Sequence, residues 1–401
     1  MGLMDTPDIG RRRWLILALG VLAQASQATV INGVAFLIPT LNQEGGFTLA
    51  QAGTLAGAPI LGGVFTLVVW GAIADRFGER LALAAGLGIA AVSMGLASAT
   101  TSLDLSRTTS AALLGLLLMC AGAGAVSANS ASGRVVVGWF PPHQRGLAMG
   151  IRQMSVPLGV AAGALVIPTL AGDHGIAWAL SFPMLACGLA AVVCAVGVVD
   201  PPRPGRVEAE RAGVLGNPYR SSMSLTRIHL ASILLVVPQY VVWTYALVWL
   251  IADRGWDEVG AGLVITAAQI LGALGRVVTG AWSDRVGSRL GPMRLVAASV
   301  VVSMVALSVT AWTDSAIAVG VLLVASILTS APNGLAFTAV AEIAGPFWGG
   351  RALGIQNTGQ FVFAAAVGPV FGGLIAAVGF PAAFALSAIA PAAAVPVIPK
   401  D

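Results

Sequence analysis

The chain has 401 residues, of which 57% are hydrophobic and only 9% are charged. A soluble domain could not expose that composition to water, so it favours a chain that lies in a membrane. The cysteines, three in number, cannot all pair with one another and show no metal-ligand spacing. We therefore expect neither a disulfide framework nor a bound metal.

Apolar segments follow one another along the chain and are separated by short polar breaks. A helix needs about 20 apolar residues to cross the hydrocarbon core of a bilayer, and these segments approach or exceed that length. The pattern predicts twelve transmembrane helices at roughly 14–40, 49–74, 81–100, 110–136, 146–170, 177–199, 228–252, 259–282, 292–312, 316–342, 351–378 and 380–398. The expected fold class is an all-α membrane protein.

The basic residues predict how the chain is oriented. If the N-terminus is cytoplasmic, the basic residues that fall on that side are Arg11, Arg12, Arg13, Arg76, Arg80, Arg145, Arg203, Arg206, Arg211, Arg220, Arg227, Arg285, Arg289, Arg294, Arg351 and Lys400. Only Arg107 and Arg254 then fall in outer loops. By the positive-inside rule we expect both termini in the cytoplasm and a multi-pass protein of the cell's inner (plasma) membrane. The net charge of +4 is then explained by the lipid bilayer as partner, and no nucleic acid is expected.

One long polar stretch divides the chain. Residues 200–226 are rich in proline and charge and lack an apolar period. Such a stretch is typical of a loop, and here it predicts a cytoplasmic linker. It would join an N-terminal six-helix bundle at 1–199 to a C-terminal six-helix bundle at 227–401.

Glycine and proline inside the apolar segments predict how the helices pack and bend. The pairs Gly53/Gly57, Gly159/Gly163 and Gly368/Gly372 have the spacing that lets two helix backbones approach closely. Proline removes a backbone hydrogen bond and bends a helix, and the prolines within segments are Pro59, Pro157, Pro168, Pro238, Pro332 and Pro369.

A ten-residue motif occurs twice, each time between the second and third apolar segments of one half. The two copies share Gly71, Asp75, Arg76, Gly78 and Arg80 in the first, and Gly280, Asp284, Arg285, Gly287 and Arg289 in the second, 209 positions later. Two copies in register indicate that the chain is a duplication. Each aspartate follows an apolar segment, so its carboxylate is placed to accept hydrogen bonds from backbone N–H groups at a helix end.

The repeated motif resembles the loop signature of the major facilitator superfamily. The resemblance implies twelve helices in two pseudosymmetric bundles, and loops that hold the two halves together on the cytoplasmic side in the outward-open state. Glu79 and Ser288 stand where that family usually has a basic residue. Arg134 and Glu342, near the ends of the fourth and tenth segments, resemble the charge partners of the signature. Alternatively, they are interfacial charges that reach the lipid headgroups.

Arg152 and Arg276 each lie about 9 Å inside a predicted span, at 1.5 Å per residue. An arginine inside a membrane costs about 3 kcal/mol or more and is by default a functional-site hypothesis. Two such groups facing one cavity would bind a carboxylate or another oxyanion through their planar forks. The alternative is that both side chains extend to the cytoplasmic surface.

A second resemblance is narrower. Residues 139–150, which begin with Trp139-Phe140 and end with Leu147-Ala148-Met-Gly150, look like the fifth-helix signature of the monocarboxylate transporter and oxalate:formate antiporter group. Arg276 stands where that group carries its substrate-binding arginine. The chain departs from the group at Arg152, which replaces a small residue, and at Gly272, which replaces an acidic one. In the eleventh segment it offers Gln356, Asn357 and Gln360 instead of a lysine.

Other polar residues inside the segments fit a central cavity. Those that we expect to contact the substrate are Asn32, Gln153, Tyr240, Trp243, Gln269 and Asn333. Gln269 and Arg276 are seven positions apart and so share a helix face. Each of these residues could equally form interhelical hydrogen bonds.

The sequence thus predicts a carrier that works by alternating access, with its site at the midplane between the halves. A small organic anion, such as a mono- or dicarboxylate, is the expected substrate. No Asp, Glu or His is expected in mid-membrane, which favours exchange or uniport over proton coupling. A drug or hydrophobic-compound exporter of the same fold and a non-transporting membrane sensor remain alternatives. No catalytic motif is present, so we expect no enzyme and no cofactor. We also expect a monomer.

Overall fold

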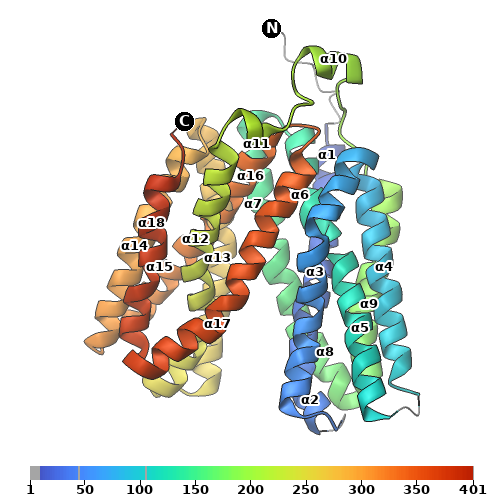
Figure 1. Cartoon of the computed structure of the whole chain (residues 1–401). Coiled ribbons are helices and arrows are strands. Elements are labelled where there is room, and N and C mark those ends of the chain that lie inside the picture. Colours follow the sequence, from blue (N-terminus) through green and yellow to red (C-terminus); the bar gives the residue numbers. More distant parts are fainter. Residues whose placement is uncertain (1–9, 44–45, 104–105, 401) are drawn as a thin grey trace. The chain divides into compact units, whose positions relative to one another are not determined.

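The computed structural model describes residues 10–43, 46–103 and 106–400, and every regular element within them is a helix (Figure 1). The elements before the linker are α1 (Arg12–Gly33), η1 (Val34–Leu37), α2 (Ile38–Gln43), α3 (Leu49–Phe77), α4 (Glu79–Thr100), α5 (Arg107–Ala125), α6 (Ser127–Trp139), η2 (Pro142–Gln144), α7 (Arg145–Gln153), α8 (Ser155–His174) and α9 (Ile176–Gly197).

The two short helices of the linker are α10 (Arg206–Arg211) and α11 (Pro218–Ser221). The elements that follow the linker are α12 (Ser224–Val248), η3 (Trp249–Asp253), α13 (Glu258–Val286), α14 (Leu290–Trp312), α15 (Ala318–Ser330), α16 (Pro332–Ala344), α17 (Gly349–Ser387) and α18 (Ile389–Val397).

Contacts between residues divide the chain into two compact units. Unit 1 consists of Met1–Trp139, Ser155–Gly216 and Gly345–Thr358, and unit 2 consists of Phe140–Met154, Asn217–Ala344 and Gly359–Asp401. Each unit therefore includes one short stretch from the other half of the sequence. In unit 1 this stretch is the first part of α17, and in unit 2 it is η2 and α7.

Within each unit the long helices run side by side (Figure 1). In unit 1, α4 packs on α9 and α5, α3 packs on α5, and α1 packs on α8 and α9. In unit 2, α13 packs on α7 and α15, while α18 packs on α12 and α14.

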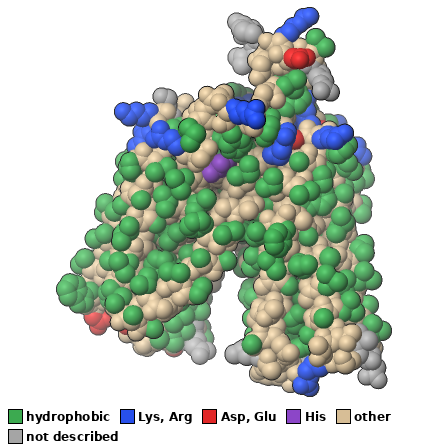
Figure 2. Space-filling view, in the orientation of Figure 1, with side chains coloured by type: hydrophobic (Ala, Val, Ile, Leu, Met, Phe, Trp, Pro, Cys, Tyr) green, Lys and Arg blue, Asp and Glu red, His purple; other side chains and the backbone are tan. Residues whose placement is uncertain are grey.

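The outer faces of the helices are apolar, and Figure 2 shows hydrophobic side chains along their length. Phe65 and Val196 in unit 1 are 71% and 78% exposed, and Trp312 in unit 2 is 81% exposed. Large apolar side chains with that exposure are stable in lipid and costly in water. The Lys and Arg side chains visible in Figure 2 gather mainly at one end of the helices of each unit.

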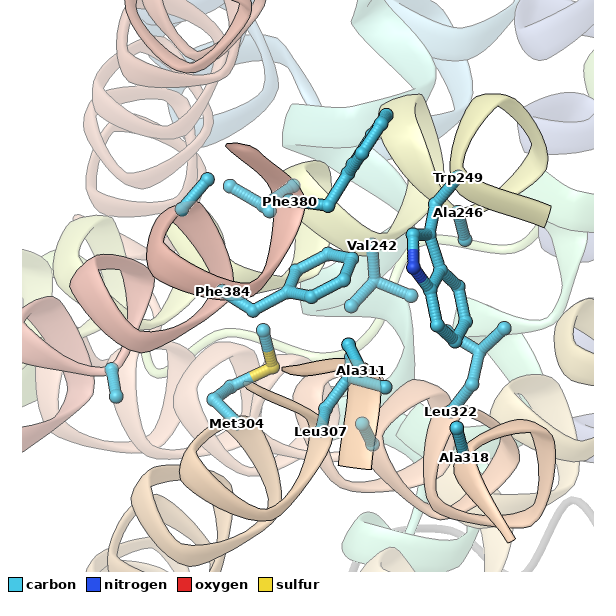
Figure 3. Packing of buried hydrophobic residues seen from close by; sticks show 14 of the residues in the cluster. Val242, Ala246, Trp249, Met304, Leu307, Ala311, Ala318, Leu322, Phe380 and Phe384 are labelled. Carbon is cyan, nitrogen blue, oxygen red and sulfur yellow. The ribbon is translucent and has the colours of Figure 1, made fainter. Parts of the chain in front are cut away.

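Unit 2 contains a densely packed apolar cluster, which Figure 3 shows from close by. Trp249 is completely buried there, and its ring lies edge-on to that of Phe384 with centroids 5.7 Å apart. Met304 and Leu307 of α14 and Leu322 of α15 pack around them. This cluster anchors η3 at the end of α12.

Eleven helical segments of the described residues are long and apolar enough to cross a membrane. Ten correspond one by one to predicted helices, and the last, Gly349–Val397, has 49 residues and covers the two remaining ones. It is interrupted at Gly379, whose φ of 79° and ψ of 170° are not helical. Because only glycine adopts this φ without strain, Gly379 sets the boundary between the predicted helices at 351–378 and 380–398.

Each of the predicted spans at 110–136, 146–170, 316–342 and 380–398 is broken at one residue. The breaks lie at Val126, Met154, Ala331 and Ala388. Proline explains the third, because Pro332 is the first residue of α16, where its missing N–H costs nothing. The break at Val126 follows the glycine-rich end of α5 and has no proline.

Only some of the glycines with this spacing lie against another helix. A Cβ added to Gly53, Gly57 or Gly368 would meet no atom within 4 Å, so these positions carry no close packing. A Cβ on Gly159 would lie 2.1 Å from the carbonyl oxygen of Ala25, so here two backbones do touch. The spacing alone does not predict close helix packing, because glycine is abundant on lipid-facing as well as packed faces.

Candidate functional site

The first copy of the repeated motif lies at the C-terminal end of α3 in unit 1. The Asp75 carboxylate accepts hydrogen bonds from the backbone N–H groups of Gly350 (2.7 Å) and Arg351 (3.0 Å), at the start of α17. The Nε of Arg351 donates to the same carboxylate at 3.0 Å. A carboxylate at a helix N-terminus binds otherwise unpaired N–H groups and favours the positive end of the helix dipole.

The second copy makes the same arrangement in unit 2. The Asp284 carboxylate accepts hydrogen bonds from the backbone N–H groups of Gly146 (2.9 Å) and Leu147 (2.8 Å), at the start of α7. Nη1 of Arg289 donates to it at 2.6 Å. Each aspartate therefore joins the end of one long helix to the beginning of another.

The glycines of the motif allow the two backbones to touch at each junction. A Cβ on Gly71 would lie 2.3 Å from the carbonyl oxygen of Gly350, and a Cβ on Gly280 would lie 2.1 Å from that of Gly146. No side chain fits at these positions. Gly78 and Gly287 end the two helices with φ angles of 101° and 71°, which also favour glycine.

Additional ion pairs surround each junction, and they differ between the units. In unit 1, buried Glu79 binds Arg134 and accepts from Nη2 of Arg203 at 2.8 Å. In unit 2, Glu342 binds Arg289 at 3.3 Å and Arg145 at 3.4 Å. Arg134 and Glu342 thus each contact the motif copy of their own unit, but through partners of opposite charge.

The carboxylates of the second junction change the pKa of Arg289. Burial lowers the pKa of its guanidinium, but Glu342 and Asp284 outweigh that effect and raise the pKa above its ordinary value. In contrast, Arg76, Arg80 and Arg285 are exposed, and no ion pair within the described part of the chain involves them. These three predicted gating residues therefore lie outside the junctions.

Three arginines make contacts at the junctions that were not expected from the sequence. Arg351 was expected only as a charge on the cytoplasmic side, yet it binds Asp75 and lies 3.8 Å from the centroid of the Trp348 ring. Arg203 of the linker donates to the carbonyl of Asp75 and, at 2.7 Å, to that of Ala74. Arg145 reaches Glu342. The repeated glycine spacing of 146/150 and 350/354 is the signal that could have located the start of α17.

A second group of residues surrounds Arg276 in unit 2. Arg276 is 3% exposed, and its Nη1 and Nε donate to the carbonyls of Gln153 (2.6 Å) and Ser330 (3.3 Å). Its guanidinium carbon lies 5.7 Å from the centroid of the Trp243 ring. No Asp or Glu among the described residues pairs with Arg276.

Arg152 lies in α7 of the same unit and is 1% exposed. Its Nη1 donates to the side-chain oxygen of Gln153 at 3.1 Å, and its guanidinium carbon lies 5.8 Å from the Phe337 ring centroid. Gln153 therefore links the two arginines, through its side chain to Arg152 and through its backbone to Arg276. Neither arginine extends to the molecular surface.

The other predicted contact residues fall into different places. Asn333 bonds to Gln239 at 2.9 Å, and Gln360 bonds to Asn333 at 3.1 Å, so these amides join α12, α16 and α17. Tyr240 packs against Trp243 with ring centroids 5.5 Å apart, and Gln269 lines a small cavity beside Trp243.

Three predicted contact residues belong to unit 1. The amide groups of Asn32 and Asn357 donate to carbonyls of their own helices, those of Ala28 and Leu353, and Gln356 is buried. The structure therefore gathers Arg152, Gln153 and Arg276 with the aromatic pair Tyr240 and Trp243 in one unit.

Long apolar helices, a duplicated helix-junction motif and buried arginines define a multi-pass membrane transporter. Residues 20–366 match the family model described as Major Facilitator Superfamily, and the chain belongs to this family. It is 47% identical over 395 residues to an "uncharacterized MFS-type transporter" of Mycobacterium tuberculosis, covering 98% of this chain and 86% of that protein. Its family is one of transporters and not of enzymes.

Two relatives have more specific names. The chain is 26% identical to the probable sulfoacetate transporter SauU of Cupriavidus necator, over 84% of this chain and 81% of that one. It is 30% identical to the tetracenomycin C resistance and export protein of Streptomyces glaucescens, over 51% of this chain and 37% of that one.

The fold agrees with solved structures. The structure of the proton:xylose symporter XylE superposes with a TM-score of 0.77 at 16% identity and covers 96% of both chains. This likeness establishes the fold alone. The narrower resemblance to the monocarboxylate and oxalate:formate group stays a prediction.

Proposed function

We propose that this transporter carries a small organic anion, a mono- or dicarboxylate or a related oxyanion, and that Arg276 supplies the positive charge that binds it. The observation that carries the proposal is the burial of Arg276 without a carboxylate partner. A buried charge is costly unless it is paired. An anionic substrate would pair with it.

The geometry of Arg276 supports a role in binding. A guanidinium group has five N–H donors, and the two bonds to Gln153 and Ser330 leave the others without an acceptor among the described residues. A planar guanidinium with free donors matches the two oxygens of a carboxylate or sulfonate. Arg152 adds a second positive charge on the other side of Gln153.

The name of one relative supports the same class of substrate. Sulfoacetate carries a sulfonate and a carboxylate, and both are oxyanions that an arginine binds. The relative from Streptomyces glaucescens favours a second candidate function, export of a drug or hydrophobic compound. A buried arginine pair has no evident use in such an exporter.

We further propose transport by alternating access of residues 1–199 and 227–401, by exchange or uniport. Asp and Glu in the described spans occur only near helix ends, which supports a mechanism without a mid-membrane proton carrier. The protein would act as a monomer in the inner membrane with both termini in the cytoplasm.

Ligand-dependent thermal stability of the purified protein tests the anion proposal. A ligand that binds only the folded state raises its melting temperature. We expect mono- and dicarboxylates or sulfonates to stabilise the wild type and not the variant Arg276→Gln. The exposed Arg285→Gln is the matched control for loss of one positive charge and should respond like the wild type.

Two results would overturn the proposal. The first is equal stabilisation of Arg276→Gln and wild type by the same anions. The second is stabilisation of the wild type by lipophilic compounds and by no anion, which would favour an exporter. Counterflow of the labelled anion in proteoliposomes then separates a transporter from a sensor that binds without transport.

A further inference from the structure

The indole N–H of Trp243 is a buried donor without a hydrogen-bond partner. Trp243 lies in α12, and its ring contacts Arg276 of α13. A buried N–H that lacks an acceptor destabilises the folded protein by about 1–3 kcal/mol. Such a group needs a physical reason.

The surroundings of Trp243 provide a reason for the unpartnered N–H. Its ring face lies under the guanidinium of Arg276, whose carbon is 5.7 Å from the ring centroid. Trp243 also lines a small cavity together with the polar residues Gln269 and Ser326 and the apolar residues Val242, Ala246, Ile265, Ala268 and Leu322. The residue that carries the unpartnered N–H therefore lies beside the buried arginine and two further polar side chains.

Trp249, which lies six residues after Trp243, can be compared with it. Its N–H is also buried without a partner, but its ring is packed into the apolar cluster of Figure 3, against Phe384. An arginine also lies over the Trp249 ring, because the guanidinium carbon of Arg254 is 5.4 Å from its centroid, but Arg254 is paired with Asp314. Arg276 above Trp243 has no carboxylate partner among the described residues, and Trp243 is only half-buried.

We propose that the Trp243 N–H binds a second acceptor group of the substrate, and that the substrate is a small difunctional anion. This inference rests on the proposed function. The two donors occupy different positions around the indole, since the guanidinium lies above the ring face and the N–H lies in the ring plane. One acidic group binds Arg276, and a second acceptor, such as another carboxylate, binds Trp243.

Two anions of equal carbon number test this proposal. Propionate carries one carboxylate and malonate carries two. We expect the wild type to bind malonate more tightly, because only malonate engages both donors. In Trp243→Phe the aromatic face remains and the N–H is lost, so malonate affinity should fall about tenfold, the effect of one hydrogen bond to a charged group. Propionate affinity should change by less than about twofold.

A second variant separates the loss of the N–H from a change in packing. Replacement of Trp243 by β-(3-benzothienyl)alanine keeps both rings and substitutes sulfur for the N–H. It should reproduce the selective loss of malonate binding. Trp249→Phe, which removes the other unpartnered indole N–H, should leave the ratio of malonate to propionate affinity unchanged.

The outcomes distinguish this inference from the function on which it rests. If both anions lose affinity equally in the two Trp243 variants, or neither does, while binding still requires Arg276, the second-donor proposal is wrong and the anion proposal stands. If the wild type binds neither these nor other small anions, both are wrong.

Discussion

Asp75 and Asp284 make the same contact in different units: each carboxylate accepts hydrogen bonds from two consecutive backbone N–H groups at the start of another helix. In both cases an arginine, Arg351 or Arg289, donates to the same carboxylate. The sequence repeat is therefore also a repeat of contacts.

Neutralising either aspartate should weaken its junction. In Asp75→Asn and Asp284→Asn one carboxylate oxygen is replaced by an NH₂ group, which faces N–H donors that it cannot bind. We expect each change to lower stability by about 1–2 kcal/mol, as for loss of a helix cap. Thermal melting in detergent measures this. A loss in only one of the two variants would show that the junctions are not equivalent.

Adding a methyl group at the junction glycines should force the helix backbones apart. The new Cβ would lie within 2.3 Å of a carbonyl oxygen in Gly71→Ala and within 2.1 Å in Gly280→Ala. Overpacking of this kind costs about 1–3 kcal/mol. Gly53→Ala and Gly57→Ala are the controls, because a Cβ there meets nothing within 4 Å. Equal melting temperatures for all four variants would refute the assigned contacts.

The Glu79–Arg134 pair should be strongly coupled. Their side chains are 0% and 4% exposed, so removal of one partner leaves a buried charge. We expect Glu79→Gln or Arg134→Gln alone to cost about 3–5 kcal/mol, and the double variant to cost less than the sum. A double-mutant cycle of unfolding measures the coupling. Additive single effects would argue against a direct ion pair.

Arg203 should stabilise the end of α3 from the linker. It donates to the carbonyls of Ala74 and Asp75 and to Glu79. We expect Arg203→Gln to lower stability by about 1–3 kcal/mol, because bonds from a charged donor are lost. Arg211→Gln is the control, since Arg211 is exposed at the end of α10. Limited proteolysis of the linker gives a second readout, with faster cleavage expected in Arg203→Gln only.

Hydropathy and the repeated motif were sufficient to predict the fold class. The length of an apolar segment is set by the thickness of the bilayer, so spans can be located without knowing their neighbours. The break at Val126 could not be predicted in this way. It is a local change in backbone angle, with a ψ of −6° at Val126, and no proline marks it.

The candidate site was predictable only in part. An arginine inside an apolar segment stands out, and Arg152 and Arg276 were found for that reason. Which polar residues share a unit with them was not predictable, because lipid-facing and packed helix faces are both apolar here. Asn32 and Asn357 thus have the same appearance in the sequence as Asn333, yet their amides bond within their own helices.

The contacts of Gly71 with Gly350 and of Gly280 with Gly146 bring backbone against backbone, with no side chains interlocked between them. Interlocked side chains must change rotamer before two helices can separate, and glycines have no rotamers. The bonds that hold these surfaces together are N–H groups to carboxylates, and water can replace both partners. Separation of either pair of backbones would therefore require no rotamer change at the glycines themselves.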